Sequence, residues 1–229
     1  MTVTSSRTLD GFVASDPRVL RVYLKAREEY DAHGLYHHDF LHIVRDLYRA
    51  LLIAEEEPAV DYAILIPAVL LHDIGFFEAD FRTLGHEVTG ARLARQWLSE
   101  IGGYTEEQIE AICHCIRAHK GRTVKPASLE ARILYDADVL EKAGAVYLLL
   151  GGKVLCEFSE TIEDFLKRET VDRAREASEG LYTRKARELD GGRLERASRL
   201  LREVHAEIQA ERSDILMDES VLWSDGPPR

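Results

Sequence analysis

The segment AVLLHDIGFF, Ala68–Phe77, places a histidine and an aspartate directly after an apolar run. The apolar residues have the composition of a buried helix, whereas His72 and Asp73 are polar groups that are costly to bury without partners. Gly75 follows two residues after Asp73 and can end a helix. The pattern predicts a short central helix, from about Asp61 to Asp73, whose end carries an imidazole and a carboxylate into the interior.

The segment from about Asp39 to Glu56 also has the periodicity of a helix, and it ends before Pro58. Apolar residues recur there every three or four positions. They predict an inner face made of Leu41, Val44, Leu47, Tyr48 and Leu51.

The segments after the central helix are helical by the same criteria, so we predict an all-α fold. A helix from His86 to Ile101 ends at Gly102-Gly103, and Thr105 with Gln108 forms a capping box that begins the next helix. Residues 131–150 have a composition that also suits a strand, but their neighbours are helical. We therefore predict a helix over 131–150.

The composition predicts one globular domain. The chain has 229 residues, of which 45% are hydrophobic, and a formal net charge of −11. We expect the charged sequence of residues 151–212 to form a C-terminal helical extension, followed by an acidic tail over 213–229. The first residues lack the pattern of a signal peptide, and no apolar run approaches the length of a membrane span. Three cysteines without a paired spacing agree with a reduced, cytoplasmic protein.

His72 and Asp73 suit a divalent cation, because imidazole nitrogen and carboxylate oxygen are ligands of hard and borderline metals. Adjacent residues on a helix point about 100° apart, so the two side chains converge on one ion only where the helix ends. Two ligands do not hold an ion, and further ones must come from elsewhere in the chain. The candidates are His42, His86, His114, His119, Asp136 and Asp138.

The order of His42, His72-Asp73 and Asp138 resembles the HD superfamily of metal-dependent phosphohydrolases. The segments YHHDFLH at 36–42, LLHDIG at 70–75 and DADVLEKAG at 136–144 are similar to motifs of that family. The resemblance covers about residues 30–150 and implies an HD-domain helical bundle with extra C-terminal helices. Residues 181–208 are similar to the C-terminal helices of small stand-alone HD hydrolases.

The resemblance implies that His42, His72, Asp73 and Asp138 hold a catalytic metal. His86, in the segment HEVTGA, is similar to a histidine that reaches the site in one version of the family, and His119 is a further candidate. With both as ligands, the set suffices for two ions bridged by Asp73. The sequence leaves open one or two ions of Mn, Mg, Fe, Co or Ni.

Other polar residues near these motifs have weaker assignments. Asp136 suggests a carboxylate that supports the ligands or begins a helix, and Lys120 and Arg122 are candidates to bind a substrate phosphate. We expect Cys113 and Cys115 to belong to the core, and we do not expect His114 to join the site. We expect Phe76, Phe77 and Phe81 to be packing residues. We expect surface or capping groups at His33, His37, His38 and His205, and His37 or His38 is the first candidate for an exception.

The leading functional hypothesis is metal-dependent hydrolysis of a phosphate ester or anhydride in a nucleotide or another small phosphorylated metabolite. A divalent metal makes hydroxide available near neutral pH, Asp73 is placed to orient or deprotonate that nucleophile, and His86 or His119 could protonate the leaving oxygen. The alternatives are a di-iron oxygenase of the same fold and a non-catalytic module that binds a nucleotide or a protein. The net charge of −11 argues against long nucleic acid as a partner, and the charged outer helices are compatible with a homodimer.

Overall fold

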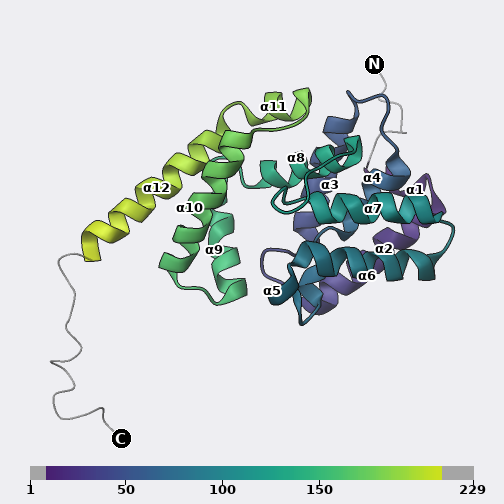
Figure 1. The fold of residues 1–229 in the computed structure, drawn as a ribbon, viewed down its shortest axis with the longest axis horizontal. Coiled ribbons are helices and arrows are strands. Elements are labelled where there is room, and N and C mark those ends of the chain that lie inside the picture. Colours follow the sequence, from purple (N-terminus) through teal and green to yellow (C-terminus); the bar gives the residue numbers. More distant parts are fainter. Residues whose placement is uncertain (1–8, 213–229) are drawn as a thin grey trace, which may run out of the picture.

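The structure is a computed structural model, and it describes residues 9–212 (Figure 1). These residues form α-helices and one 3-10 helix, which confirms the all-α prediction; the predicted acidic tail, 213–229, lies outside the described residues. The elements in chain order are α1 Leu9–Ala14, α2 Pro17–His33, α3 Phe40–Ala54, α4 Tyr62–Leu71, η1 Ile74–Phe77, α5 Phe81–Leu84, α6 His86–Ile101, α7 Glu106–Ala118, α8 Leu129–Glu141, α9 Val146–Phe158, α10 Ile162–Glu179, α11 Arg184–Asp190 and α12 Arg193–Arg212. Across residues 9–212, no helix has the length and apolar character that crossing a bilayer requires.

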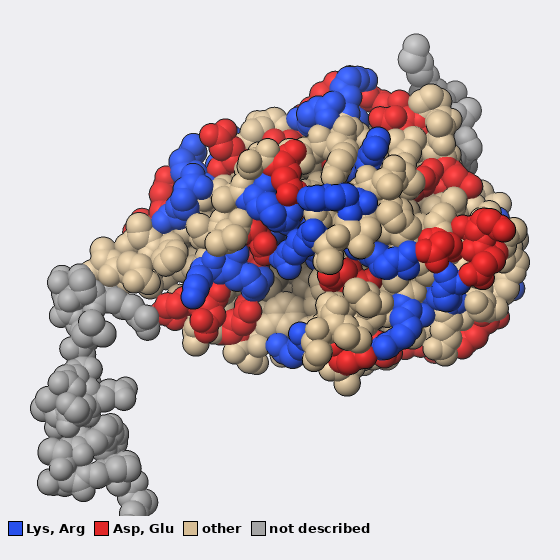
Figure 2. All heavy atoms as spheres, viewed as in Figure 1, with Lys and Arg blue, Asp and Glu red and all other residues tan. Residues whose placement is uncertain are grey.

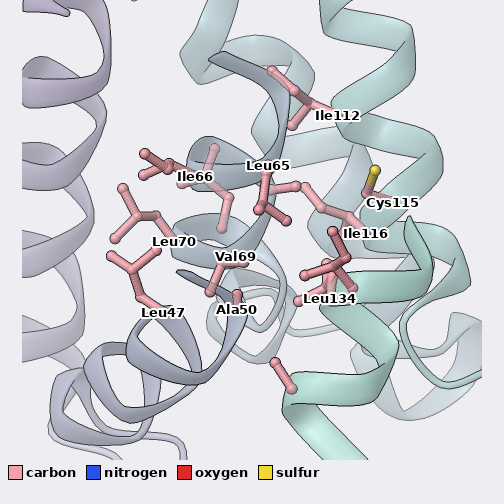
Figure 3. Close-up of a cluster of buried hydrophobic side chains, with 14 of the residues drawn as sticks. Leu47, Ala50, Leu65, Ile66, Val69, Leu70, Ile112, Cys115, Ile116 and Leu134 are labelled. Carbon is pink, nitrogen blue, oxygen red and sulfur yellow. The ribbon is translucent and has the colours of Figure 1, made fainter. Parts of the chain in front are cut away.

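Helix α4 lies at the centre of the main hydrophobic core, as the opening segment predicted. Its residues Leu65 through Leu71 are all buried, and α2, α3, α7 and α8 pack around it. Figure 3 shows Leu65, Ile66 and Val69 of α4 among side chains from α3, α7 and α8. Asp61 caps the start of α4 by accepting the backbone N–H of Ala63 at 2.8 Å. The end of this apolar helix therefore lies inside the protein.

Helix α3 has the predicted position but a different buried face. Leu41 and Tyr48 are 65% and 59% exposed, whereas His42 and Asp46 are buried beside Leu47. The prediction was wrong at Leu41 and Tyr48 because it assigned the inner face by hydrophobicity alone. The helix turns His42 and Asp46 inward. This orientation brings an imidazole and a carboxylate, which both bind metals, to the centre of the fold.

The single helix predicted over 131–150 is two helices, α8 and α9, separated at residues 142–145. Gly144 has φ +83°, a conformation that L-residues rarely adopt, and its N–H donates to the carbonyl of Arg193 at 2.9 Å. The glycine thus lies in the turn between the two helices and holds the start of α12 against that turn. Sequence periodicity missed this break because it depends on a contact 49 residues away.

The C-terminal helices form a second, smaller hydrophobic cluster beside the main one. Helices α10 and α12 pack on each other, and α12 also contacts α9 (Figure 1). The buried members of this cluster are Tyr147, Val154, Phe165, Leu166 and Leu201. Helix α11 returns to the main body and packs on α3 and α8. The extension therefore covers one side of the body that contains α3, α4 and α8.

Gly75 allows the closest backbone approach between η1 and α6. A Cβ at Gly75 would lie 1.9 Å from the carbonyl oxygen of His86 and 2.6 Å from the backbone nitrogen of Gly90. The hydroxyl of Thr89 donates to the Gly75 carbonyl at 3.1 Å, which fastens the two segments. Because His86 begins α6, this contact sets the position of His86 relative to Asp73.

We expect Gly75→Ala to destabilise the protein by about 3 kcal/mol or more, since backbone atoms on both sides must move to admit the methyl group. Urea unfolding measures the change. The matched control is Gly152→Ala in α9, where a Cβ meets no atom within 4 Å; it should stabilise the protein by roughly 0.5–1 kcal/mol. Equal effects of the two changes would contradict the close approach.

Candidate metal centre

Side chains from several helices meet beside the end of α4. His42 comes from α3, and Asp138 comes from α8. His72 is the C-terminal cap of α4 with helical φ and ψ, whereas Asp73 has φ −108° and ψ 5°. Because the α-helix ends between them and η1 begins, the two neighbouring side chains both reach the same interior space.

Asp73 is the centre of the cluster, and its two carboxylate oxygens face different partners. Oδ2 lies 3.2 Å from Nε2 of both His42 and His72. Oδ1 lies 3.4 Å from Nε2 of both His86 and His119. The side chain of Asp73 is 0% exposed. The structure therefore brings five of the predicted residues together and divides the histidines into two pairs, one at each oxygen.

The atoms of this cluster fit a metal ion. His42, Asp46, His72 and Asp138 offer one ligand atom each, and all four atoms lie within 4.8 Å of one another. His72, Asp73 and His119 form a second such group. Within the described residues, several buried atoms here make no hydrogen bond: Asp46 Oδ2, His72 Nε2, Asp73 Oδ1 and Asp138 Oδ1. Buried polar atoms are rarely left unpaired, and one divalent cation would satisfy those of Asp46, His72 and Asp138 together, whereas Asp73 Oδ1 faces the other pair of histidines.

Backbone carbonyls orient two of the imidazoles toward the cluster. His72 Nδ1 donates to the carbonyl of Val69 at 2.8 Å, and His119 Nδ1 donates to the carbonyl of Ile116 at 2.6 Å. When the proton is on Nδ1, Nε2 is unprotonated and carries a lone pair, and this tautomer binds a metal through Nε2. Both residues cap the ends of their helices, so the carbonyl three residues earlier is within reach.

The two histidine pairs differ in their electrostatic environment. Burial and then the charge of Lys120 lower the pKa of both His86 and His119, which keeps these imidazoles neutral. Burial also disfavours the charged form of His42, but Asp46, Asp73 and Glu141 outweigh it and raise its pKa to about 10. The carboxylates around His42 thus attract a positive charge that a metal ion could supply in place of the proton.

Three residues that sequence reasoning missed contact this centre. Asp46 lies one turn after His42 on α3, and Glu141 and Lys142 lie one turn after Asp138 on α8. Lys142 Nζ lies 2.6 Å from Asp138 Oδ2. Their spacing of three or four residues from a predicted ligand was a usable signal, because such residues share a helix face.

His37 and His38 are buried, although surface or capping positions were expected for these histidines. One of the two was the first candidate for such an exception. His38 Nδ1 pairs with Glu157 of α9, and its Nε2 lies 3.9 Å from Asp73 Oδ2. His33 is exposed and bonds locally to the carbonyl of Glu29. His114 accepts the backbone N–H of Ala127 at 3.2 Å, so this contact directs it to a loop and not to the cluster.

The hydrogen bonds of Asp136 lead away from the metal cluster. Its carboxylate accepts hydrogen bonds from the backbone N–H of Tyr182, the backbone N–H of Thr183 and the hydroxyl of Thr183, at 2.7–2.9 Å. These partners immediately precede α11. Asp136 therefore holds the C-terminal extension to α8 and does not support the ligands through any of these bonds.

We expect Asp136→Ala to lower the free energy of unfolding by about 1–3 kcal/mol, because the change leaves buried donors at Tyr182 and Thr183 without an acceptor. Urea unfolding followed by circular dichroism measures this effect. Metal content, measured on the same preparation, should match the unmodified protein. A variant that is stable but depleted of metal would instead indicate that Asp136 supports the metal ligands.

A cleft of about 410 Å³ lies beside the cluster, between the main body and helices α9 and α10. Phe76 and Phe81 line it together with Phe158 of α9, and the rings of Phe76 and Phe81 also pack against each other with centroids 5.2 Å apart. Phe77 does pack, against Tyr30. Figure 2 shows basic side chains gathered on the face where the C-terminal helices meet the main body.

Basic side chains in the cleft pair with different acidic groups. Arg122 pairs with Asp172 of α10. Lys120 Nζ lies 3.4 Å from Asp138 Oδ2, and although burial disfavours its charge, Asp138 and Asp73 raise its pKa to about 12. Lys120 is thus a charged lysine at the boundary between the metal cluster and the cleft.

Comparison with known proteins agrees with this geometry. Residues 39–143 match the model of the HD domain family. A predicted HD superfamily hydrolase from an uncultured Thermotogales bacterium is 24% identical, with a TM-score of 0.60 over 87% of this chain and 98% of the other. No curated protein sequence matches the chain.

Two further solved structures have the same fold. YpgQ of Bacillus subtilis, solved in complex with ADP, is 21% identical with a TM-score of 0.57, covering 83% of this chain and 94% of its own. The Lin1889 protein of Listeria innocua is 17% identical with a TM-score of 0.53, covering 83% and 97%. At these identities the likeness concerns the fold.

Proposed function

We propose that the chain, whose residues 39–143 match the HD domain family, is a metal-dependent phosphohydrolase acting on a nucleotide or another small phosphorylated metabolite. One observation carries the proposal: His42, Asp46, His72 and Asp138 bring buried ligand atoms within 4.8 Å of one another, next to a cleft lined by Lys120 and aromatic rings. The description of the Thermotogales relative as a predicted hydrolase supports the same class of reaction.

We assign the first ion to His42, His72, Asp73 and Asp138. A divalent cation bound there supplies hydroxide at neutral pH and neutralises charge on a phosphoryl oxygen. The chain holds the substrate phosphate next to it through Lys120, whose Nζ lies at the mouth of the cluster. Burial disfavours the charged form of Asp138, but the cations Lys120 and Lys142 outweigh it and lower its pKa, so that carboxylate stays ionised.

Asp73, His86 and His119 have different roles in the two possible forms of the site. With one ion, Asp73 Oδ1 is free to accept a proton from the attacking water, and an imidazole is free to act on the leaving oxygen. With two ions, Oδ1 and both imidazoles are ligands of the second. The second form fits better, because His86 Nε2 and His119 Nε2 lie 3.2 Å apart and His119 carries its proton on Nδ1.

The aromatic side of the cleft supports a nucleotide as substrate. Phe76, Phe81 and Phe158 have ring centroids 5.2–6.3 Å apart, and the guanidinium of Arg82 lies over Phe81 at 5.1 Å. A base could stack on these rings while its phosphates reach Lys120. ADP in the YpgQ complex is consistent with this substrate class.

We expect the protein loaded with manganese to release phosphate or pyrophosphate from members of a panel of nucleotides and phosphate esters. Phosphate detection after pyrophosphatase treatment measures both products. Lys120→Met should raise KM for those substrates without removing metal, because Lys120 contacts substrate and not the ion. Arg92→Met, which removes an exposed ion pair on α6, is the control and should change neither quantity.

The di-iron oxygenase remains the alternative of a different class, since six nitrogen and oxygen ligands would also bind iron. An oxygen-consumption assay with the iron-loaded protein separates the two. Substrate-dependent oxygen uptake without release of phosphate from any compound would favour the oxygenase. Binding of a nucleotide without turnover by either metal form would favour the non-catalytic module.

A further inference from the structure

We propose that Asp46 is a further ligand of the first ion, in addition to the four residues of the HD pattern. This inference rests on the proposed metal centre and adds a carboxylate oxygen to it. Asp46 lies on α3 one turn after His42, and its side chain is 0% exposed. With Asp46, the ligands of the first site would be two imidazoles and three carboxylates.

The distances place Asp46 Oδ2 among the ligand atoms. Oδ2 lies 3.4 Å from His42 Nε2 and 3.8 Å from His72 Nε2. Its ligand atom also lies within 4.8 Å of the one that Asp138 offers. Ligands that share one ion at about 2.0–2.2 Å are necessarily this close to one another. The carboxylate thus lies where a ligand must be.

The two oxygens of Asp46 have different surroundings. Oδ1 accepts a hydrogen bond from Arg49 Nη1 at 2.8 Å, whereas Oδ2 makes no hydrogen bond within the described residues. Asp138 has the same arrangement, with Oδ2 held by Lys142 at 2.6 Å and Oδ1 unpaired. In each case a cation holds the outer oxygen and leaves the inner one for an ion. Asp136, which lies outside the cluster, has both oxygens occupied.

Asp46 does not occupy the position of a carboxylate that merely orients His42. Such a carboxylate contacts the ring nitrogen that is turned away from the metal. Glu141 has that position, with Oε1 3.6 Å from His42 Nδ1, and Arg45 holds Glu141 in turn at 2.7 Å. Asp46 instead faces His42 Nε2, the nitrogen that points at Asp73 and His72.

A third carboxylate determines which cation suits the site. Zinc is satisfied by four ligands, whereas harder cations such as manganese take more ligands and prefer oxygen. Asp46 therefore favours Mn²⁺ or Fe²⁺ over Zn²⁺ at the first position. A water molecule should occupy its coordination position when the side chain is removed.

The test is a titration of metal-free protein with Mn²⁺ alone, followed by the EPR signal of the free ion. Asp46→Ala should weaken binding of one ion by more than about 100-fold, beyond the roughly 10- to 100-fold typical of residues that only support ligands. The ion that still binds at high concentration should enhance solvent proton relaxation more strongly, because a further water reaches it. Arg49→Met, which leaves Oδ2 in place, is the matched control and should not gain that water.

His72→Ala separates this inference from the proposed function. If His72→Ala loses Mn²⁺ while Asp46→Ala binds it with unchanged affinity and relaxation, the metal centre stands and Asp46 is not a ligand. If His72→Ala also binds Mn²⁺ normally, the metal centre itself is refuted, and the role of Asp46 with it. Should Asp46→Ala fail to fold, Asp46→Asn keeps the shape and must still show a loss of affinity, or the proposal fails.

Discussion

We expect the replacement of Asp73 with alanine to remove the bound metal and all hydrolysis while leaving the helical content nearly unchanged. The two oxygens of Asp73 face the two histidine pairs at 3.2 and 3.4 Å, so its carboxylate is central whether the site holds one ion or two. The change deletes a small polar group and opens no large apolar cavity, and the hydrophobic residues of α4 keep their contacts. Metal analysis, phosphate release and circular dichroism measure the three quantities.

Asp80→Ala is the control for this change. Asp73 precedes η1 and Asp80 follows it. The carboxylate of Asp80, however, pairs with the exposed Arg92. The Asp80 variant should keep its metal and its activity. Normal metal content in Asp73→Ala would refute the metal centre, and a loss of metal in both variants would point to a disturbed η1 segment rather than to a missing ligand.

The sequence predicted the elements that depend on local signals. The capping box of Thr105 and Gln108 begins α7, and the glycines at 102 and 103 follow α6, because caps and glycines act within a few residues. The helix that carries His72 into the core was predictable for the same reason. An apolar run that ends in polar residues and a glycine needs no tertiary information to be recognised.

The orientation of α3 was not predictable from hydrophobicity. An apolar residue is expected inside, yet Leu41 is exposed and Asp46 is buried. Burial of Asp46 is possible only because Arg49 and the other members of the cluster surround it, and two of those members, His72 and Asp138, come from other helices. The sequence of α3 alone does not identify the partners that other helices supply. Sites that bind ions depart from the hydrophobic pattern in this way.

Asp136 and Asp138 show the same limit at α8. Residues two apart on a helix point about 200° from each other, so one faces the cluster and the other faces away. Which partner meets the outward carboxylate depends on α11, 46 residues later in the chain. The same holds for His38, whose partner Glu157 comes from α9. Long-range contacts of the C-terminal extension thus decide several roles that motif positions leave open.

The pair of histidines at Asp73 Oδ1 decides between one ion and two. In the two-ion form, His86→Ala and His119→Ala should each reduce the metal content from about two ions per chain toward one, because two-metal sites share a bridging ligand but not their terminal ones. The losses should be equal, since both imidazoles lie 3.4 Å from the same oxygen. Turnover should fall with the second ion.

In the one-ion form, both variants would keep about one ion per chain, and only the rate would fall, by roughly 10²- to 10⁴-fold for a lost acid or base. Metal content therefore distinguishes the forms without reference to the substrate. His114→Ala on α7 is the matched control, because its contact is the loop residue Ala127. Two neutral imidazoles with Nε2 atoms 3.2 Å apart, beside an unpaired carboxylate oxygen, lead us to expect the two-ion result.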